Sequence, residues 1–99
     1  MSERLNEQQI EQKLKAATGW TREGHLIKKQ YSFPSFPDGL AFLVRLGFEA
    51  EAADHHPDIT VDYKRVTLAY WTHSEGGLTE KDFAGAATAD RIAAGFLKK

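Results

Sequence analysis

The sequence predicts an α+β fold with two layers, in which three helices cover one face of a four-stranded antiparallel sheet. Two pairs of short segments with strand-like patterns, within residues 20–33 and 59–73, are each interrupted by a turn, as in β-hairpins. Each hairpin precedes a longer segment whose apolar residues recur at helical spacing, and a short helical segment precedes the first hairpin. The predicted order is therefore α-β-β-α-β-β-α, within a single domain that spans residues 1–99.

Capping residues, glycine and proline divide the first half of the chain. Asn6 and Gln9 form the pattern of a helix N-terminal cap, and Gly19 is expected to end this first helix. Strands are predicted over residues 20–23 and 25–33, around a turn at residues 23–24. The next helix is predicted over residues 36–54, because Pro57 disfavours helical geometry at the residue before it.

The second hairpin is predicted to have a two-residue turn at Lys64 and Arg65. With this turn, paired apolar residues of the two strands would form one buried face. The residues of that face are Ile59, Val61 and Tyr63, opposite Tyr70, Leu68 and Val66 respectively. The last helix is predicted over residues 78–99, with Thr79 as its cap and a core-facing side made of Phe83, Ala86, Ala93, Phe96 and Leu97.

The middle helix is apolar around much of its circumference. This is more apolar surface than one face of the sheet can cover, so we expect a homo-oligomer whose interface includes this helix. The apolar residues on which this expectation rests are Leu40, Phe42, Leu43, Leu46 and Phe48.

Composition excludes several classes of function. Thirteen basic and fourteen acidic residues give a net charge of −1, and without a basic stripe no nucleic acid is expected as a direct partner. The chain has no cysteine, which excludes disulfides, thiolate zinc sites and a cysteine nucleophile. No apolar run is long enough to span a membrane, and the N-terminus lacks a signal-peptide pattern, so a cytoplasmic location is expected.

Three histidines near the end of the middle helix and of the second hairpin are the candidates for chemistry. His55 and His56 precede Pro57, and Thr72-His73 ends the hairpin. Histidine exchanges protons near neutral pH, so such a group can supply both a general acid and a general base. The fourth histidine, His25, lies at a hairpin turn and is expected to be solvated.

The nearby residues allow other interpretations. Glu51 and His55 are four residues apart on a helix and could form a surface pair. Asp82 follows Thr79 by three residues, where a carboxylate stabilises the start of a helix. A zinc site made of two or three histidines and Glu51 would support hydrolysis and is the main alternative. Spacing alone does not choose among these.

Together these motifs resemble the signature of the pterin-4a-carbinolamine dehydratase family. The signature comprises Glu51-x-x-x-His55-His56-Pro57, an aromatic at Tyr63, Thr72-His73, Leu78-Thr79-Glu80-Lys81-Asp82, and Trp20 after the first helix. The resemblance covers nearly the whole chain. It implies the fold predicted above and an enzyme that needs neither metal nor bound cofactor. Trp71 is bulkier than the resemblance leads us to expect and would narrow the entrance to the site.

The resemblance also implies a reaction and roles for individual residues. The substrate would be a 4a-hydroxytetrahydropterin left by an aromatic amino-acid hydroxylase, and dehydration would give the quinonoid dihydropterin for reuse. His55 would be the acid at the 4a-oxygen, His73 the base, and His56 a substrate-binding residue. The neighbouring residues expected to bind substrate or orient the histidines are Glu51, Asp82, Trp20, Pro57 and Thr72, with Trp20 as a stacking wall. Family members assemble as dimers or tetramers, and some also serve as dimerisation cofactors of a transcription factor.

Overall fold

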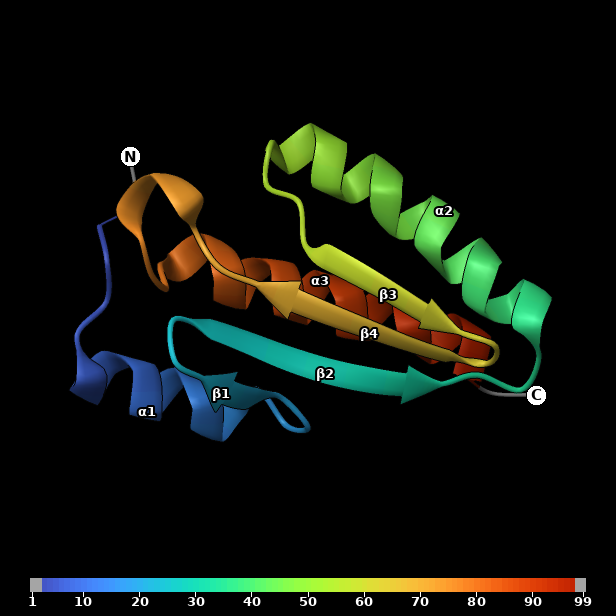
Figure 1. The fold of residues 1–99 in the computed structure, drawn as a ribbon, viewed down its shortest axis with the longest axis horizontal. Coiled ribbons are helices and arrows are strands. Elements are labelled where there is room, and N and C mark those ends of the chain that lie inside the picture. The colour runs from blue at the N-terminus through green and yellow to red at the C-terminus, as the bar shows by residue number, and fades with distance from the viewer. Residues whose placement is uncertain (1–2, 98–99) are drawn as a thin grey trace.

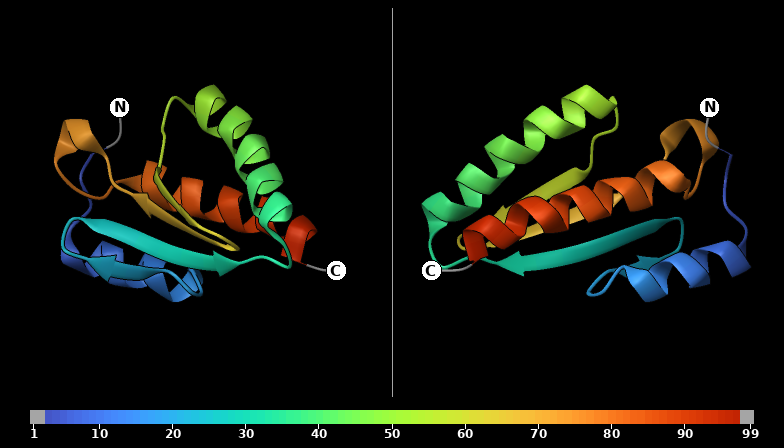
Figure 2. Two further views of the ribbon diagram at one scale, coloured as in Figure 1. Left: turned by 45° about the vertical axis from the view of Figure 1, so that its right-hand side comes forward. Right: turned by 180° about the vertical axis from the view of Figure 1, so that it is seen from behind.

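Four antiparallel strands form one sheet in the order β1-β2-β4-β3, and three helices lie against one face of it (Figures 1 and 2). This computed structural model describes residues 3–97. The elements are α1 (Glu7–Ala16), β1 (Thr21–Glu23), β2 (Leu26–Ser32), α2 (Phe36–Ala53), β3 (Asp58–Asp62), β4 (Arg65–Tyr70), a 3-10 turn (His73–Glu75) and α3 (Glu80–Leu97). The predicted fold class and element order are confirmed.

The core lies between the inner face of the sheet and the helices. Alternation along β2 and β4 turns their apolar side chains to this face, where α2 and α3 cover them. The sheet contributes Ile27, Tyr31, Val66, Leu68 and Tyr70, and the helices contribute Ile10, Phe42, Leu46, Ala86, Ala89 and Ala93, all of them buried. The helices α2 and α3 also pack against each other, and the residues just after α2 contact the start of α3, which is where the candidate site lies.

Local signals set the limits of the first two helices. The Asn6 side chain accepts a hydrogen bond from the Gln9 backbone and the Gln9 side chain accepts one from Asn6, so the predicted cap is a complete capping box. The helix α2 ends at Ala53, as expected, and Asp54 adopts a left-handed conformation with φ of 52°. This conformation turns the chain sharply out of the helix just before the two adjacent histidines.

The register predicted for the second hairpin is wrong by one position in the turn. Asp62 pairs with Arg65, so the two turn residues are Tyr63 and Lys64 rather than Lys64 and Arg65. Tyr63 adopts a positive φ of 53° and is exposed, with its ring stacked on Phe36 at 6.4 Å. The first residue of this turn needs a left-handed backbone conformation, which tyrosine rarely adopts. The sequence pattern therefore did not indicate that Tyr63 belongs to the turn.

The observed register changes which residues lie opposite each other, but each residue keeps its expected face of the strand. Val61 now lies opposite Val66, and Ile59 lies opposite Leu68. Half of the expected buried face is nevertheless exposed, because β3 is an edge strand of the sheet. Ile59 and Val61 are 48% and 42% exposed. Leu97, predicted to face the core, is also exposed.

Large apolar side chains follow one exposed stripe along α2. Phe36, Leu40, Val44 and Phe48 recur every four residues, and Phe48 and Val44 are 71% and 64% exposed. Phe42 and Leu46 of the neighbouring stripe are the ones that reach the core. Of the five residues from which an oligomer was expected, only Leu40 and Phe48 lie on this exposed stripe, because Phe42 and Leu46 are buried against the sheet. No helix within residues 3–97 has the length and apolarity needed to cross a membrane.

Candidate active site

The three histidines of the motif meet where the carboxyl ends of α2 and β4 approach the start of α3 (Figure 1). They line one open hollow of about 360 Å³, which we call the histidine hollow. Its lining residues are Asp54, His55, His56, Trp71, Thr72, His73, Ser74 and Lys81. Residues up to 27 positions apart in the sequence therefore face the same space.

His55 is the histidine that the protein holds most firmly. Its Nε2 lies 2.7 Å from Oδ1 of Asp82, a carboxylate that is completely buried. Its ring stacks on Tyr70 at 5.9 Å with 21° between the planes, and only 13% of the side chain is exposed. An ionised carboxylate only accepts hydrogen bonds, so this contact assigns a proton to Nε2 and leaves Nδ1 for a ligand. The buried negative charge stabilises an imidazolium whenever the ring is protonated.

Two threonines hold Asp82 in place. Its Oδ2 accepts hydrogen bonds from Oγ1 of Thr72 at 2.8 Å and from the backbone N–H of Thr79 at 2.9 Å. The two threonine hydroxyls are 2.7 Å apart, and Thr79 Oγ1 also accepts from the backbone N–H of Lys81 at 3.2 Å. Since Thr72 donates to the carboxylate, Thr79 must donate to Thr72. The Thr79 hydroxyl therefore donates to the Thr72 hydroxyl, which donates to Asp82, the carboxylate that contacts His55. These buried hydrogen bonds also hold the first residues of α3.

His56 has a different environment from its neighbour. Its Nε2 lies 2.9 Å from Oε1 of Glu51, one turn back on α2, and the side chains are 54% and 83% exposed. The pair that the sequence suggested, Glu51 with His55, is therefore not the pair that forms. A water-exposed pair of this kind contributes little to stability and leaves His56 free to adjust to a ligand.

His73 is positioned by stacking rather than by a carboxylate. Its ring lies on Trp71 with centroids 3.9 Å apart and 28° between the planes. The ring of His25 makes a T-shaped contact with Trp71, with centroids 4.4 Å apart and 78° between the planes. His25, which we expected to be a solvated turn residue, is exposed but is thus connected to the site through Trp71.

The structure does not bring every predicted residue into the histidine hollow. Trp20 is 5% exposed, contacts Tyr31 and Tyr70, and donates from Nε1 to Oδ2 of Asp90 at 3.1 Å. It belongs to the core and is not among the residues that line the hollow, so a stacking wall at that position is not what the geometry offers. Pro57 lies in the loop before β3, and its contribution is to hold the chain that follows His56 extended.

The carboxylates and histidines of the site form separate contacts and do not surround a common point where a metal ion could bind. Asp82 holds His55, Glu51 holds His56, and His73 contacts an aromatic ring. Among residues 3–97, no three His, Asp or Glu side chains are arranged so that they could hold a metal ion. The arrangement places three imidazoles in different surroundings beside one hollow, which suits proton transfer to and from a ligand.

Sequence reasoning missed three contributors to the site. Tyr70, expected only as a core residue, stacks on His55, and burial together with the charge of Asp82 raises the pKa of its phenol to about 12. Thr79, expected only as a cap, is a link in the chain to Asp82. Lys81 lines the hollow with an ammonium that makes no ion pair within the described residues. Its place in the motif Leu78-Thr79-Glu80-Lys81-Asp82 was the available signal, although no role for Lys81 was predicted from it.

Comparisons with known proteins agree on one family. The model of the pterin 4 alpha carbinolamine dehydratase family matches residues 3–92. A protein of Roseiflexus sp. (strain RS-1) with the name pterin-4-alpha-carbinolamine dehydratase is 50% identical over 92 residues, which cover 93% of this chain and 99% of that protein. One of Mycobacteroides abscessus with the same name is 44% identical over 86 residues, covering 87% and 92% of the two chains.

Two solved structures have the same fold. The transcriptional coactivator/pterin dehydratase from Brucella melitensis superposes with a TM-score of 0.88 at 34% identity, over 91% of this chain and 98% of that one. A pterin dehydratase-like protein described as a RuBisCO assembly factor in the α-carboxysome gives a TM-score of 0.62 at 25% identity, over 75% and 86%. Because the family model spans most of the chain and relatives with that name are 44–50% identical over most of its length, the chain belongs to the pterin-4a-carbinolamine dehydratase family.

Proposed function

We propose that the protein dehydrates a 4a-hydroxytetrahydropterin to the quinonoid dihydropterin by histidine acid-base catalysis. The observation that carries the proposal is the pairing of His55 with a buried carboxylate inside a hollow that also contains His56 and His73. The family to which the chain belongs supports the choice of a pterin. By returning the dihydropterin, such an enzyme would serve an aromatic amino-acid hydroxylase that produces the carbinolamine.

The reaction needs a proton delivered at one atom and removed at another. The bond from N5 to hydrogen breaks, its electron pair forms the C4a–N5 double bond, and the C4a–O bond breaks as the oxygen takes a proton and leaves as water. One imidazole must begin protonated and another neutral, and each transfer contributes on the order of 10²- to 10⁴-fold.

The environments of the histidines favour particular roles. Asp82 stabilises positive charge on His55, so His55 is suited to protonate the 4a-oxygen through Nδ1. His73 has no carboxylate among its contacts in the described structure and is exposed, which suits a neutral base at N5. The exposed pair of His56 and Glu51 suits a contact with the pterin that is equally strong before and during the reaction.

A rapid-mixing assay tests the proposal. The carbinolamine is generated enzymatically, and loss of its absorbance is followed with and without the protein. Stimulation well above the spontaneous rate supports a dehydratase, whereas unchanged decay would contradict the proposal. Metal analysis and chelator treatment separate this mechanism from a histidine zinc hydrolase, because activity that disappears with chelator and returns with zinc would favour the latter.

Single histidine variants test the assigned roles. His55→Ala and His73→Ala should lower kcat strongly, because each removes a proton-transfer partner that acts in the transition state. His56→Ala should act mainly on KM. His25→Ala is the matched control, and we expect a small effect because its contact with the site passes through Trp71. If His25→Ala costs as much as His55→Ala, the acid-base assignment is wrong.

A further inference from the structure

Trp71 and His73 form an aromatic stack on the wall of the histidine hollow, just after the end of β4. Their ring centroids are 3.9 Å apart, with 28° between the planes. Thr72, between them, has an extended backbone, and its buried hydroxyl donates to Asp82. The side chains on either side of an extended residue point away from it in the same direction, so Trp71 and His73 both face the hollow.

The turn between β1 and β2 holds the indole ring of Trp71. Ile27 of β2 pairs with Tyr70 of β4, and this register brings His25, two residues before Ile27, to the ring of Trp71. The indole therefore contacts two rings that come from different parts of the chain. These contacts limit the orientations open to it, so it presents a defined face to His73.

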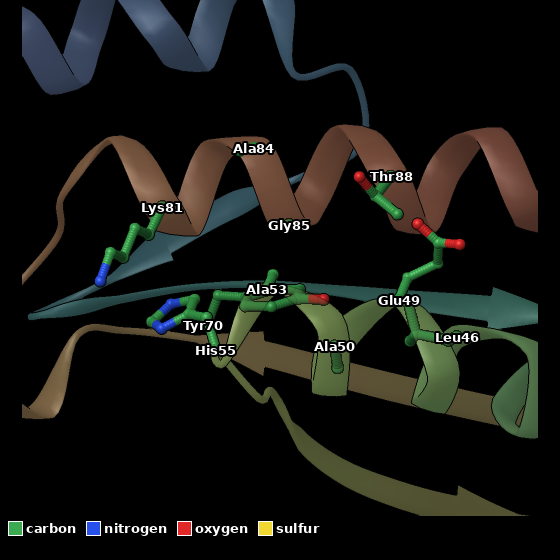
Figure 3. A pocket seen from close by; sticks show the side chains of 10 residues that line it. All are labelled: Leu46, Glu49, Ala50, Ala53, His55, Tyr70, Lys81, Ala84, Gly85 and Thr88. Atoms are coloured by element: carbon green, nitrogen blue, oxygen red, sulfur yellow. The ribbon is translucent and has the colours of Figure 1, made fainter.

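The stack is also the main contact of the His73 side chain. Within residues 3–97, neither ring nitrogen of His73 makes a hydrogen bond or an ion pair, and the carboxylate of Asp82 faces His55 instead. The ammonium of Lys81 is directed toward His55, with which it lines two pockets (Figure 3). Among the described residues, the indole of Trp71 is thus the group in contact with His73 that can respond to a charge on its ring.

A base at His73 would acquire its charge against this indole. In the proposed reaction the ring of His73 starts neutral and takes the proton from N5, so it gains a full positive charge. The face of an aromatic ring attracts a cation within about 6 Å of its centroid, and tryptophan does so most strongly. At 3.9 Å the attraction is greater for the imidazolium than for the neutral imidazole, so it grows as the proton is transferred.

We propose that Trp71 is a positioning residue for the reaction, which holds the ring of His73 in the hollow and stabilises the positive charge that develops on it. This inference rests on the proposed function. It gives the bulk of Trp71 a purpose beyond narrowing the entrance to the site, because a smaller side chain at this position would leave His73 without a ring to lie on.

Fluorination of the indole tests the charge without changing the shape of the side chain. Fluorine withdraws electrons and weakens the attraction of the ring face for a cation. Trp71 alone is replaced by tryptophan with one, two or three fluorine atoms on its six-membered ring. The chain has two tryptophans, so the same series at Trp20, which lies in the core, is the matched control. The quantity measured is the single-turnover rate constant at saturating carbinolamine, together with KM.

The rate constant should fall stepwise with each fluorine at position 71, by about threefold to tenfold over the series, and stay unchanged at position 20. KM should change little, because the substrate does not carry the charge concerned. A flat series, a rate that rises with fluorination, or an effect on KM alone would each overturn the inference. The last result would show that Trp71 serves only as a wall for the pterin.

Two substitutions provide a second test. Trp71→Leu removes the aromatic face and should lower the rate constant by about tenfold, whereas Trp71→Phe keeps a face and should retain most of the rate. Equal losses in the two variants would contradict a role for the aromatic face. If the original protein does not accelerate dehydration at all, the proposed function itself fails. If it does and the fluorinated series is flat, the role given to Trp71 fails alone.

Discussion

Replacement of Asp82 by asparagine separates the charge of this residue from its shape. Oδ2 accepts two hydrogen bonds, from Thr72 and Thr79, so the amide oxygen of the asparagine should take that side. The amide nitrogen then faces Nε2 of His55, which must become an acceptor. The ring proton consequently moves to Nδ1, and an imidazolium loses the negative charge 2.7 Å away.

The expected loss is large in rate and moderate in stability. A neutral imidazole is a much weaker acid than an imidazolium, so nearly the whole contribution of one proton-transfer partner is lost. We expect kcat to fall by at least about 100-fold. The free energy of unfolding should fall by about 2 kcal/mol, because a charge-assisted hydrogen bond in a fully buried site becomes a neutral one. KM should change little, since the hollow keeps its shape.

Three measurements follow on the same protein: kcat and KM by rapid mixing, unfolding by denaturant, and the tautomer of His55 by nitrogen NMR. Asp90→Asn is the matched control, since Asp90 lies on the same helix and accepts hydrogen bonds from Trp20, Lys29 and Tyr31 away from the histidines. It should lose stability and keep its kcat. An Asp82→Asn variant that keeps kcat within about threefold, with the proton of neutral His55 moved to Nδ1, would refute the role given to this carboxylate.

Three further predictions follow from packing, burial and exposure. Gly85→Ala should lower the free energy of unfolding by about 1–3 kcal/mol in denaturant titrations, because the new Cβ would lie 2.5 Å from Cε1 of Tyr70; unchanged stability would contradict this close approach. Stability should be highest below pH 10 and fall as the pH rises toward 12, because the pKa of Tyr70 is raised from 10 to about 12 and the unfolded chain ionises first; Tyr70→Phe should flatten the decline measured by denaturation from pH 9 to 12, by about 2 kcal/mol. We also propose that the exposed stripe of α2 forms a homo-oligomer, so Phe48→Glu should reduce the sedimentation mass while the original protein exceeds a monomer at micromolar concentration.

Sequence reasoning succeeded for the fold because the local signals agree with the tertiary structure. These signals act within a few residues: Asn6 caps α1, the strand pattern predicts β2, and Pro57 limits the end of α2. The helix start, the strand and the helix end all lie close to where they were predicted. It failed at Tyr63, where the turn needs a backbone conformation that tyrosine itself does not favour. The exposure of Ile59 was also out of reach, since a pattern defines the face of a strand but not its place at the edge of a sheet.

The sequence predicted which histidines form the candidate site better than it predicted their partners. His55, His56 and His73 line one hollow, as expected. The sequence suggested Glu51 as the partner of His55, because these residues lie one helical turn apart, but the turn at Asp54 rotates His55 away toward Asp82. Trp20 was misleading for a related reason, since a tryptophan with a buried N–H partner serves a core as well as it would serve a ligand.

The two duties of Asp82 bear on how such a protein could change over evolution. The carboxylate that orients His55 also accepts the first hydrogen bond of the start of α3, so its loss would damage the helix as well as the reaction. The exposed histidines carry no such double duty. A descendant that gave up catalysis for another role could discard His56 and His73 at little thermodynamic cost, whereas selection for a folded chain alone would retain the aspartate. In a lineage without activity, the carboxylate would therefore survive as a relic of the enzyme.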